Sequence, residues 1–375
     1  MANILIIGGG FGGLVAAETL AKSINTDHQI TLVSRDRNFV FYPDLVRLAF
    51  GKCEREDISI DLPKTMLHRR VRFIQGEVAR LNPEAKHVRM SYGDVEGNLP
   101  YDFLILALGR RLATERVTGF FEYASHILDV RSALAFGEKV KAFKGGQVVI
   151  GQCAGARLPV PVYETAFAFS RVLRERGQSD AARITIVDPD PPNLAFGDLN
   201  MARALRNAIE GHSIETLSNF SVQRISPGVV TTSNGLALKY NLLMLVPPFQ
   251  GPGPVIGLGV TGDEGYIKVD RKMRVQQIEN VYAVGDCVDF VGPKLGHMAV
   301  HQAEVAAANL ALELKGKEPN VLYDHDMMMV IDEGGKESIY FHDSLWDDKR
   351  SIVKQGRFWS WAKRVHEKYW LATHS

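Results

Sequence analysis

The sequence is short of cysteine and of long apolar runs, and both shortages exclude classes of protein. Only three cysteines occur in 375 residues, namely Cys53, Cys153 and Cys287. Their wide spacing predicts neither a disulfide framework nor a metal site. No apolar run reaches the about 18 residues that a membrane-spanning helix needs. The N-terminus has no basic segment before its first apolar run, so we expect no signal peptide.

An excess of one charge is also missing. The chain has 44 Lys and Arg against 43 Asp and Glu, which gives a net charge of +1. Bulk electrostatics therefore indicates no nucleic-acid partner. With 46% hydrophobic and 23% charged residues, the composition is that of a globular protein, and the length fits two or three domains.

The first 36 residues carry the most informative motif. An apolar run from Ile4 to Ile7 precedes Gly8-Gly9-Gly10-Phe11-Gly12-Gly13, and an apolar helical pattern follows from Leu14 to Ala21. A second apolar run covers Ile30 to Val33. The order strand, glycine turn, helix, strand is typical of a dinucleotide-binding unit.

The glycines of this motif have separate roles. Gly8 makes the tight turn, Gly10 admits a pyrophosphate, and Gly13 lets helix and strand pack closely. Free N–H groups at the helix N-terminus favour the phosphate charge. An acid usually follows the second strand and binds the ribose, but here Ser34 and Arg35 occupy that place. A serine hydroxyl can bind a ribose and an arginine a 2′-phosphate, so FAD and NADP both stay open.

Later apolar runs predict a second unit of the same kind. Strands are expected within Tyr101 to Gly109, Gln147 to Gly151, Ile184 to Asp188 and Asn280 to Asp286. A long helix is expected from about His297 to Leu314. The order of these segments indicates two nucleotide-type domains, with the second inserted in the first.

Three of these motifs, in this order, resemble the flavoproteins with two dinucleotide-binding domains: Gly8-x-Gly10-x-x-Gly13, Tyr101 to Gly109, and Tyr282 to Asp286. Closer matches resemble sulfide:quinone oxidoreductase and its flavocytochrome relatives. These matches are Phe39 to Pro43, Val162 to Glu164, Pro248 to Pro252, Gly292 to Met298 and Glu367 to Leu371.

This resemblance implies an α/β fold of two tandem Rossmann-like (three-layer ββα) domains and a C-terminal amphipathic helical segment. It implies an FAD-binding domain in residues 1–115 and 270–316, a second domain in 116–269 and a C-terminal segment in 317–375. The implied FAD-binding residues are Gly8, Gly10, Phe11, Gly12, Gly13, Ser34, Arg35, Pro43, Val78, Ala107, Gly109, Gly285, Asp286, Lys294, Leu295 and Gly296.

The resemblance also implies catalytic roles. Asp286 would bind the ribityl chain of FAD, and Lys294 would stabilise the anionic reduced flavin. Glu164 would be a proton relay, since a buried carboxylate has a raised pKa. Taken without the resemblance, Lys294 reads as a surface lysine and Glu164 as an acid near a helix N-terminus.

The chain departs from that family where sulfide is oxidised. The family's cysteines fall on Leu128, Leu158 and the Met327 to Met329 segment, and its histidines on Ser132 and Ala195. Cys153, five residues before Leu158, is the remaining catalytic candidate. One thiol cannot supply the thiolate pair of the family's route, so the sulfide half-reaction is in doubt. With Leu128 in place of a cysteine, we expect noncovalent FAD.

NADH is the alternative donor, as in type II NADH:quinone oxidoreductases. The second glycine turn, Gly151 to Pro161, lacks the middle glycine, and Pro159 and Pro161 delay the helix that should face the phosphates. Asp188 can still bind a ribose, although it also fits a turn. A third hypothesis is an FAD-binding subunit or scaffold that has lost catalysis.

The C-terminal segment predicts a helix at the membrane interface. Phe358, Trp361, Ala362, Val365 and Tyr369 recur at helical spacing, and most basic residues lie off that stripe. Docking of this stripe on the protein itself or on a second copy in a homo-oligomer is the alternative. We expect a monotopic enzyme on the cytoplasmic side of the membrane. Its quinone site would hold Tyr340, Phe341, Tyr369 and Trp370.

Overall fold

The computed structural model describes residues 1–190, 196–347 and 351–375, and it is built around one mixed and one parallel sheet. The first sheet has the strand order β18-β8-β1-β2-β5-β6-β7. Its strands are β1 (Asn3–Ile7), β2 (Gln29–Ser34), β5 (Arg72–Asn82), β6 (His87–Gly93), β7 (Asn98–Pro100), β8 (Phe103–Leu106) and β18 (Val281–Ala283). Pairing is parallel from β18 to β5 and antiparallel from β5 to β7.

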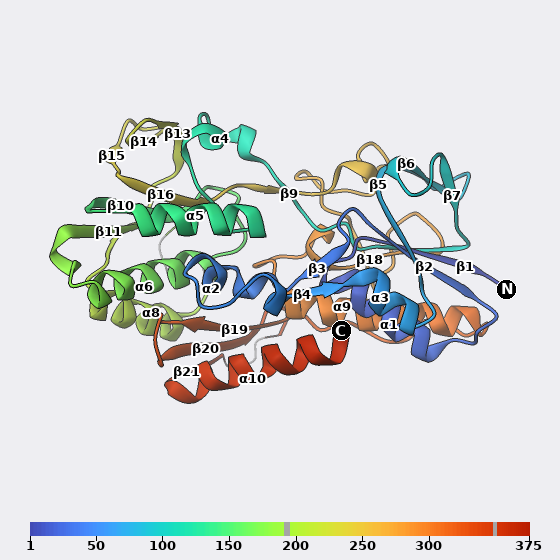
Figure 1. Cartoon of the computed structure of the whole chain (residues 1–375). Helices are drawn as coiled ribbons and strands as arrows, with labels where there is room; N and C mark the ends of the chain where they lie inside the picture. Colours follow the sequence, from blue (N-terminus) through green and yellow to red (C-terminus); the bar gives the residue numbers. More distant parts are fainter. Residues whose placement is uncertain (191–195, 348–350) are drawn as a thin grey trace.

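The central strands of this sheet are apolar because helices cover them. Ile4, Leu5, Ile6 and Ile7 are all buried, as expected for parallel strands with two covered faces. The helices α1 (Phe11–Ser23) and α9 (Gly296–Leu314) pack against each other beside them. β18 comes late in the sequence and pairs with β8, so the chain returns to this sheet after building the second one (Figure 1).

The second sheet has the order β12-β11-β10-β16 and is parallel. Its strands are β10 (Gly146–Gln152), β11 (Ala182–Val187), β12 (Glu215–Leu217) and β16 (Leu242–Val246). A three-stranded antiparallel sheet accompanies it, formed by β13 (Val222–Ser226), β14 (Val229–Thr232) and β15 (Ala237–Lys239). The helices of this part are α4 (Phe120–Tyr123), α5 (Val130–Ala142), α6 (Val160–Glu175) and α8 (Leu199–Gly211). The α/β class with two Rossmann-like sheets is therefore confirmed.

Short elements connect the two sheets. β9 (Arg111–Leu112) pairs with β17 (Phe249–Gln250) where the chain crosses between the sheets. β3 (Asn38–Val40), the single-turn helix η1 (Tyr42–Asp44), α2 (Leu45–Ala49), β4 (Ser59–Asp61) and α3 (Leu62–His68) follow β2. Figure 1 shows α2 lying between the two halves, next to α5.

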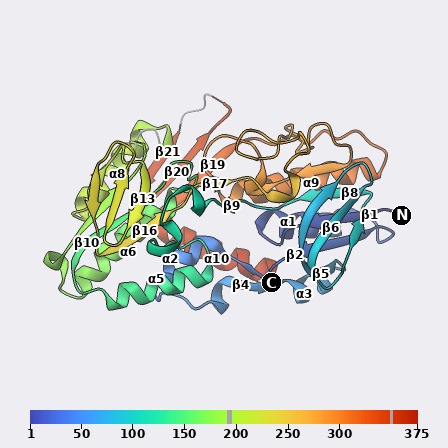
Figure 2. The same cartoon turned by 90° about the horizontal axis from the view of Figure 1, so that it is seen from above.

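The C-terminal part contains a β-sheet, although the sequence predicted only a helical segment there. β19 (Asp326–Asp332), β20 (Ser338–Ser344) and β21 (Ile352–Gln355) form an antiparallel sheet, and α10 (Arg357–His374) follows it. α10 contacts β19 and β20 and also β4 of the first half, so it runs beneath both halves (Figures 1 and 2). Among the described residues, no helix combines the length and apolarity needed to cross a bilayer. The division at residues 115, 269 and 316 stays a prediction.

Candidate cofactor and substrate cavities

The glycine turn after β1 has the geometry that a bound dinucleotide requires. A Cβ atom on Gly13 would lie 1.7 Å from the carbonyl oxygen of Gly8, and one on Gly8 would lie 2.0 Å from that of Ala107. Gly10 differs, because a Cβ atom there meets no atom within 4 Å. Gly8 and Gly13 are therefore needed for close packing, whereas Gly10 leaves open space at the N-terminus of α1. A pyrophosphate fits this cradle.

A cavity of about 1070 Å³, here called the cofactor cavity, opens from this turn. Ligand sites in proteins typically measure about 300–1,000 Å³, so a dinucleotide can be accommodated. Many of the implied FAD residues line it: Gly8, Gly10, Ser34, Arg35, Val78, Ala107 and Gly109. Of the others, Gly12 and Gly13 are buried in the first turn of α1, where they keep α1 close to β1 and β18.

Acidic side chains line the cofactor cavity near the end of β2, where the ribose of a bound dinucleotide is expected. Ser34 ends β2 and donates its hydroxyl to the carbonyl of Asp36 at 2.8 Å. Glu77 on the adjacent strand β5 lines the cavity, as does Asp36. Arg35 lies 3.6 Å from the Asp36 carboxylate and 3.9 Å from that of Glu77. These acids offset the Arg35 charge and weaken the case for a 2′-phosphate. Sequence reasoning missed Glu77, since β2 and β5 become neighbours only in the sheet.

Asp286 meets a partner that the sequence did not predict. Its carboxylate forms an ion pair with the guanidinium of Arg110, and each side chain is 12% exposed. Arg110 lies 4.3 Å from the ring centroid of Phe249 and lines the cofactor cavity. The sequence offered one sign of this role for Arg110. It directly follows Gly109, where the chain returns to the dinucleotide turn.

Lys294 is buried, contrary to the reading as a surface lysine. Only 5% of the residue is exposed, and Nζ donates to the carbonyl of Val288 at 2.5 Å. Burial, followed by the charge of Arg157, lowers the pKa of Lys294 to about 7, although Asp286 acts in the opposite direction. A buried amine whose pKa is close to neutral pH can gain a proton when negative charge develops beside it.

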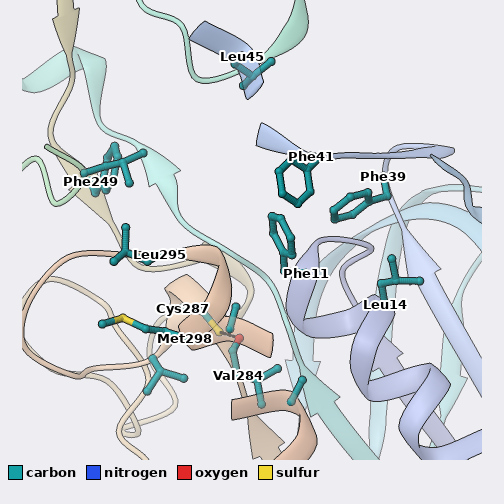
Figure 3. Packing of buried hydrophobic residues seen from close by; sticks show 14 of the residues in the cluster. Phe11, Leu14, Phe39, Phe41, Leu45, Phe249, Val284, Cys287, Leu295 and Met298 are labelled. Carbon is teal, nitrogen blue, oxygen red and sulfur yellow. Dashed lines mark hydrogen bonds between the residues drawn. The ribbon is translucent and has the colours of Figure 1, made fainter. Parts of the chain in front are cut away.

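A second cavity of about 420 Å³, the apolar cavity, adjoins the first. Tyr42, Leu45, Arg110 and Leu128 line both. Phe11, Pro43, Leu295 and Gly296, all implied FAD residues, line the apolar cavity. Figure 3 shows Phe11, Phe39 and Phe41 packed together on one side of the site, with Leu295 and Phe249 across from them. Leu128, Leu158, Met328 and Met329, at the positions predicted for the family cysteines, also line this cavity, whereas Met327 is buried and does not.

One end of the apolar cavity is charged. Glu164 on α6 is 4% exposed, and its Oε1 lies 2.5 Å from Nζ of Lys363 on α10. The backbone N–H of Asp332 also donates to Glu164 Oε1, at 2.9 Å. Burial raises the pKa of Glu164, and Lys363 opposes part of that shift. His366 and Glu367 line the same cavity. A carboxylate held this way can pass a proton to a ligand in the cavity.

The four predicted quinone residues divide into two pairs. Tyr340 and Trp370 line the apolar cavity, and Trp370 is 7% exposed beside Phe11. Phe341 is fully buried and packs near Phe196 instead, because neighbouring residues of β20 point to opposite faces. Tyr369 is 67% exposed, since consecutive residues of a helix do not share a face. The structure therefore corrects the placement of Phe341 and Tyr369.

The cysteines do not reach either cavity wall. Cys153 is fully buried with Val149, Val187 and Leu245, and burial raises its pKa to about 12. This position argues against the predicted catalytic role. Cys287 packs within 3.4 Å of the carbonyl of Leu106, and Cys53 is half-buried. Ser132 lies in the first turn of α5, where its backbone N–H and its hydroxyl both donate to the carboxylate of the N-cap residue Asp129. Ala195 lies outside the described residues.

The second glycine turn differs from the first in its length and in the contacts of its side chains. α6 begins at Val160, eight residues after β10 ends at Gln152, whereas α1 begins four residues after β1 ends. The amide of Gln152 donates to Asp188 Oδ2 at 3.0 Å, and Asp188 is 4% exposed. Burial raises the pKa of Asp188 to about 6. The candidate ribose ligand of NADH is thus already hydrogen-bonded and covered.

A dinucleotide turn on the first sheet, the matching second sheet and the adjoining apolar cavity define a flavoprotein oxidoreductase. The chain belongs to the family described as pyridine nucleotide-disulphide oxidoreductase, whose model matches residues 2–303. FAD is the cofactor of this family, and the cofactor cavity fits it.

The relatives narrow the class further. The chain is 25% identical to "Sulfide-quinone reductase" of Aquifex aeolicus over 98% of this chain and 90% of that protein. The solved structure of the sulfide:quinone oxidoreductase from that bacterium has a TM-score of 0.93 at 26% identity, and the match covers 100% of this chain and 91% of the other. A "Type II NADH:quinone oxidoreductase" of Haemophilus influenzae is 21% identical over 83% of this chain and 80% of its own length. The resemblance to flavoproteins that act on quinones is confirmed.

Proposed function

We propose that this protein is an FAD-dependent quinone oxidoreductase that reduces its quinone in the apolar cavity. The observation that supports this most directly is the shared wall of the two cavities, formed by Tyr42, Leu45, Arg110 and Leu128. Bound FAD would take an electron pair from a donor and pass it to the quinone. A quinone ring is flat and apolar with two polar edges, which suits an aromatic wall with a charged end.

The residues of this chain have distinct tasks in that scheme. Tyr340 and Trp370 offer aromatic surfaces to the quinone ring. Glu164 and Lys363 hold a proton at the charged end, and the apolar wall excludes water from the ring. Lys294 stabilises negative charge near Asp286.

The donor half stays open between sulfide and NADH. The Aquifex relative carries sulfide in its name, but here leucine and methionine side chains occupy the positions expected for thiols. The Haemophilus relative carries NADH in its name, yet Gln152 covers Asp188. A silent FAD-binding scaffold is the remaining alternative, and the loss of the family cysteines motivates it.

α10 supports attachment to the membrane surface. Phe358 and Trp361 are each 60% exposed and Val365 is 45% exposed. Most of the apolar stripe thus points away from the protein, whereas Ala362 faces the apolar cavity. Docking of the stripe on a second copy of the chain is the alternative. We propose that this stripe enters the membrane interface on the cytoplasmic side, so that the quinone reaches the cavity from the lipid.

A cavity-filling variant tests the quinone site. Ala362 lines the apolar cavity from α10, and Ala372 is exposed on the same helix. With chemically reduced flavin, Ala362→Trp should slow reoxidation by quinone at least tenfold and leave reoxidation by oxygen unchanged. Ala372→Trp should change neither rate. Equal quinone rates for Ala362→Trp and the wild type would contradict the proposed site.

A further inference from the structure

A buried group of charges lies directly behind the charged end of the apolar cavity. Asp44 ends η1, Arg47 lies one turn later in α2, and Glu367 lies on α10. Nη1 of Arg47 is 2.9 Å from Glu367 Oε1, 3.0 Å from Glu367 Oε2 and 3.4 Å from Asp44 Oδ1. These three residues bind α10 to the first half of the protein, and we call them the acid pair cluster.

The cluster has one more acid than it needs to hold the helix. Arg47 and Glu367 alone would form a neutral ion pair. Asp44 adds a second carboxylate that is 0% exposed, and its Oδ2 has no hydrogen-bond donor among the described residues. A buried carboxylate oxygen without a donor is unfavourable in an apolar medium, and a proton that the neighbouring Glu367 can accept removes that charge.

The surroundings favour that proton. Burial, then the side chain of Glu367, raise the pKa of Asp44 to about 8. The charged or titratable groups that face Asp44 are Arg47 on α2, Cys53 after it, and Glu367 and Lys363 on α10. Arg47 and Lys363 act in the opposite direction but do not reverse the shift. A proton held between two carboxylates belongs to the pair rather than to one residue.

The cluster touches the cavity through Glu367. Glu367 lines the apolar cavity, as do Pro43 and Leu45 on either side of Asp44. Lys363 lies one helical turn before Glu367 and contacts Glu164 at 2.5 Å. His366, next to Glu367 on α10, also lines the cavity and is exposed, so it connects the cavity with solvent.

We propose that Asp44 and Glu367, held together by Arg47, store a proton and deliver it to the quinone through Glu367. This inference rests on the proposed quinone reductase function. Reduction of a quinone to a hydroquinone takes two electrons, which the proposed FAD supplies, and two protons. One proton would move from Asp44 to Glu367 and on to a quinone oxygen. The other would be the proton that an anionic reduced flavin releases on reoxidation, passed on by the Glu164 and Lys363 pair. The Asp44 store would then refill from solvent past His366.

The test compares variants at one turnover. Chemically reduced wild-type protein and Asp44→Asn are mixed with a soluble short-chain quinone, and the flavin absorbance is followed across a pH series. The wild-type rate should fall as the pH rises past the pKa of Asp44, because the stored proton is lost. Asp44→Asn should be at least tenfold slower at neutral pH and should lack that inflection. Glu367→Gln should behave in the same way.

Glu18→Gln is the matched control. Glu18 is also buried and pairs with His374 at 2.5 Å, so it ties the end of α10 without lining either cavity. This variant should keep the wild-type rate and pH profile. If it slows the reaction as much as Asp44→Asn does, the acid pair cluster only positions the helix and the proposal fails.

Infrared spectroscopy tests, without turnover, whether Asp44 holds a proton. A protonated carboxylic acid has a C=O stretch that the carboxylate lacks, and Glu164 can contribute to this band as well. The difference spectrum of wild type minus Asp44→Asn at neutral pH should therefore show the band of Asp44. Absence of the band from this difference spectrum would overturn the proposal. A wild type that shows the band but reacts no faster with quinone than with oxygen would instead overturn the proposed function, and the proposed delivery with it.

Discussion

At the scale of single residues, two glycines of the first turn should distinguish an effect on FAD binding from an effect on folding. Gly10 has φ of −79°, and a Cβ atom there meets nothing, so Gly10→Ala should fold as the wild type does. It should lose FAD, because the methyl group occupies the cradle. Gly13→Ala forces its Cβ against a carbonyl oxygen and should destabilise the protein by about 1–3 kcal/mol. Flavin content and thermal unfolding distinguish the two variants, and normal FAD content in Gly10→Ala would contradict the assignment.

Lys294 makes a prediction about pH. Its pKa in the folded protein, about 7, lies below the ordinary lysine value of 10.5. The unfolded chain therefore binds more protons between these values, and stability rises with pH over that interval. Lys294→Met should flatten the rise in urea unfolding of the FAD-free protein. In the holoprotein it should lower the flavin potential, where about 30 mV corresponds to 1.4 kcal/mol of lost stabilisation. An unchanged potential would remove Lys294 from the flavin site.

At the scale of elements, α10 has two functional faces. Its inner face carries Lys363, Glu367 and Trp370, and its outer face carries the exposed apolar stripe. We expect Phe358→Ser combined with Trp361→Ser to weaken liposome binding at least tenfold, because less apolar area enters the interface. Phe121→Ser, at a site 89% exposed on α4, is the control. A liposome flotation assay measures both, and equal binding by all variants would contradict a membrane role for α10.

The element scale also shows where sequence reasoning ends. Helical spacing predicted α10 and its stripe, and the glycine motif predicted the β1, α1, β2 unit, because both patterns are local. The ion pair of Lys363 could not be predicted, since its partner Glu164 is 199 positions away in the chain. Tyr340 and Phe341 were paired although a strand separates neighbours onto opposite faces. The acid pair cluster went unnoticed for the same reason, as Arg47 and Glu367 are 320 positions apart.

At the scale of the whole molecule, the two halves meet around the two cavities, and α10 bridges them (Figure 1). FAD should therefore stabilise the assembly as well as supply chemistry. A ligand present at 100 times its dissociation constant adds about 2.7 kcal/mol to the free energy of unfolding. We expect removal of FAD to lower the melting temperature by several degrees and added FAD to restore it. No shift on FAD removal would mean that the cofactor cavity is not where FAD binds.

The donor question also belongs to this scale. The anaerobic protein is mixed with sulfide and with NADH in separate cuvettes while flavin absorbance is followed. Since Gln152 covers Asp188, NADH should bleach the flavin slowly, and Gln152→Gly should accelerate it. Rapid bleaching of the wild type by NADH would instead establish an NADH:quinone oxidoreductase. Bleaching by sulfide would mean that the reaction proceeds without the family's thiols.

The central claim is that electrons leave this flavoprotein to a quinone in the apolar cavity. The most direct measurement is stopped-flow reoxidation of the chemically reduced protein by a soluble quinone and, separately, by oxygen. The account predicts that quinone reoxidises the flavin much faster than oxygen, and that a quinone-site inhibitor abolishes the difference. Reoxidation by quinone no faster than by oxygen would contradict the account and favour the silent FAD-binding scaffold.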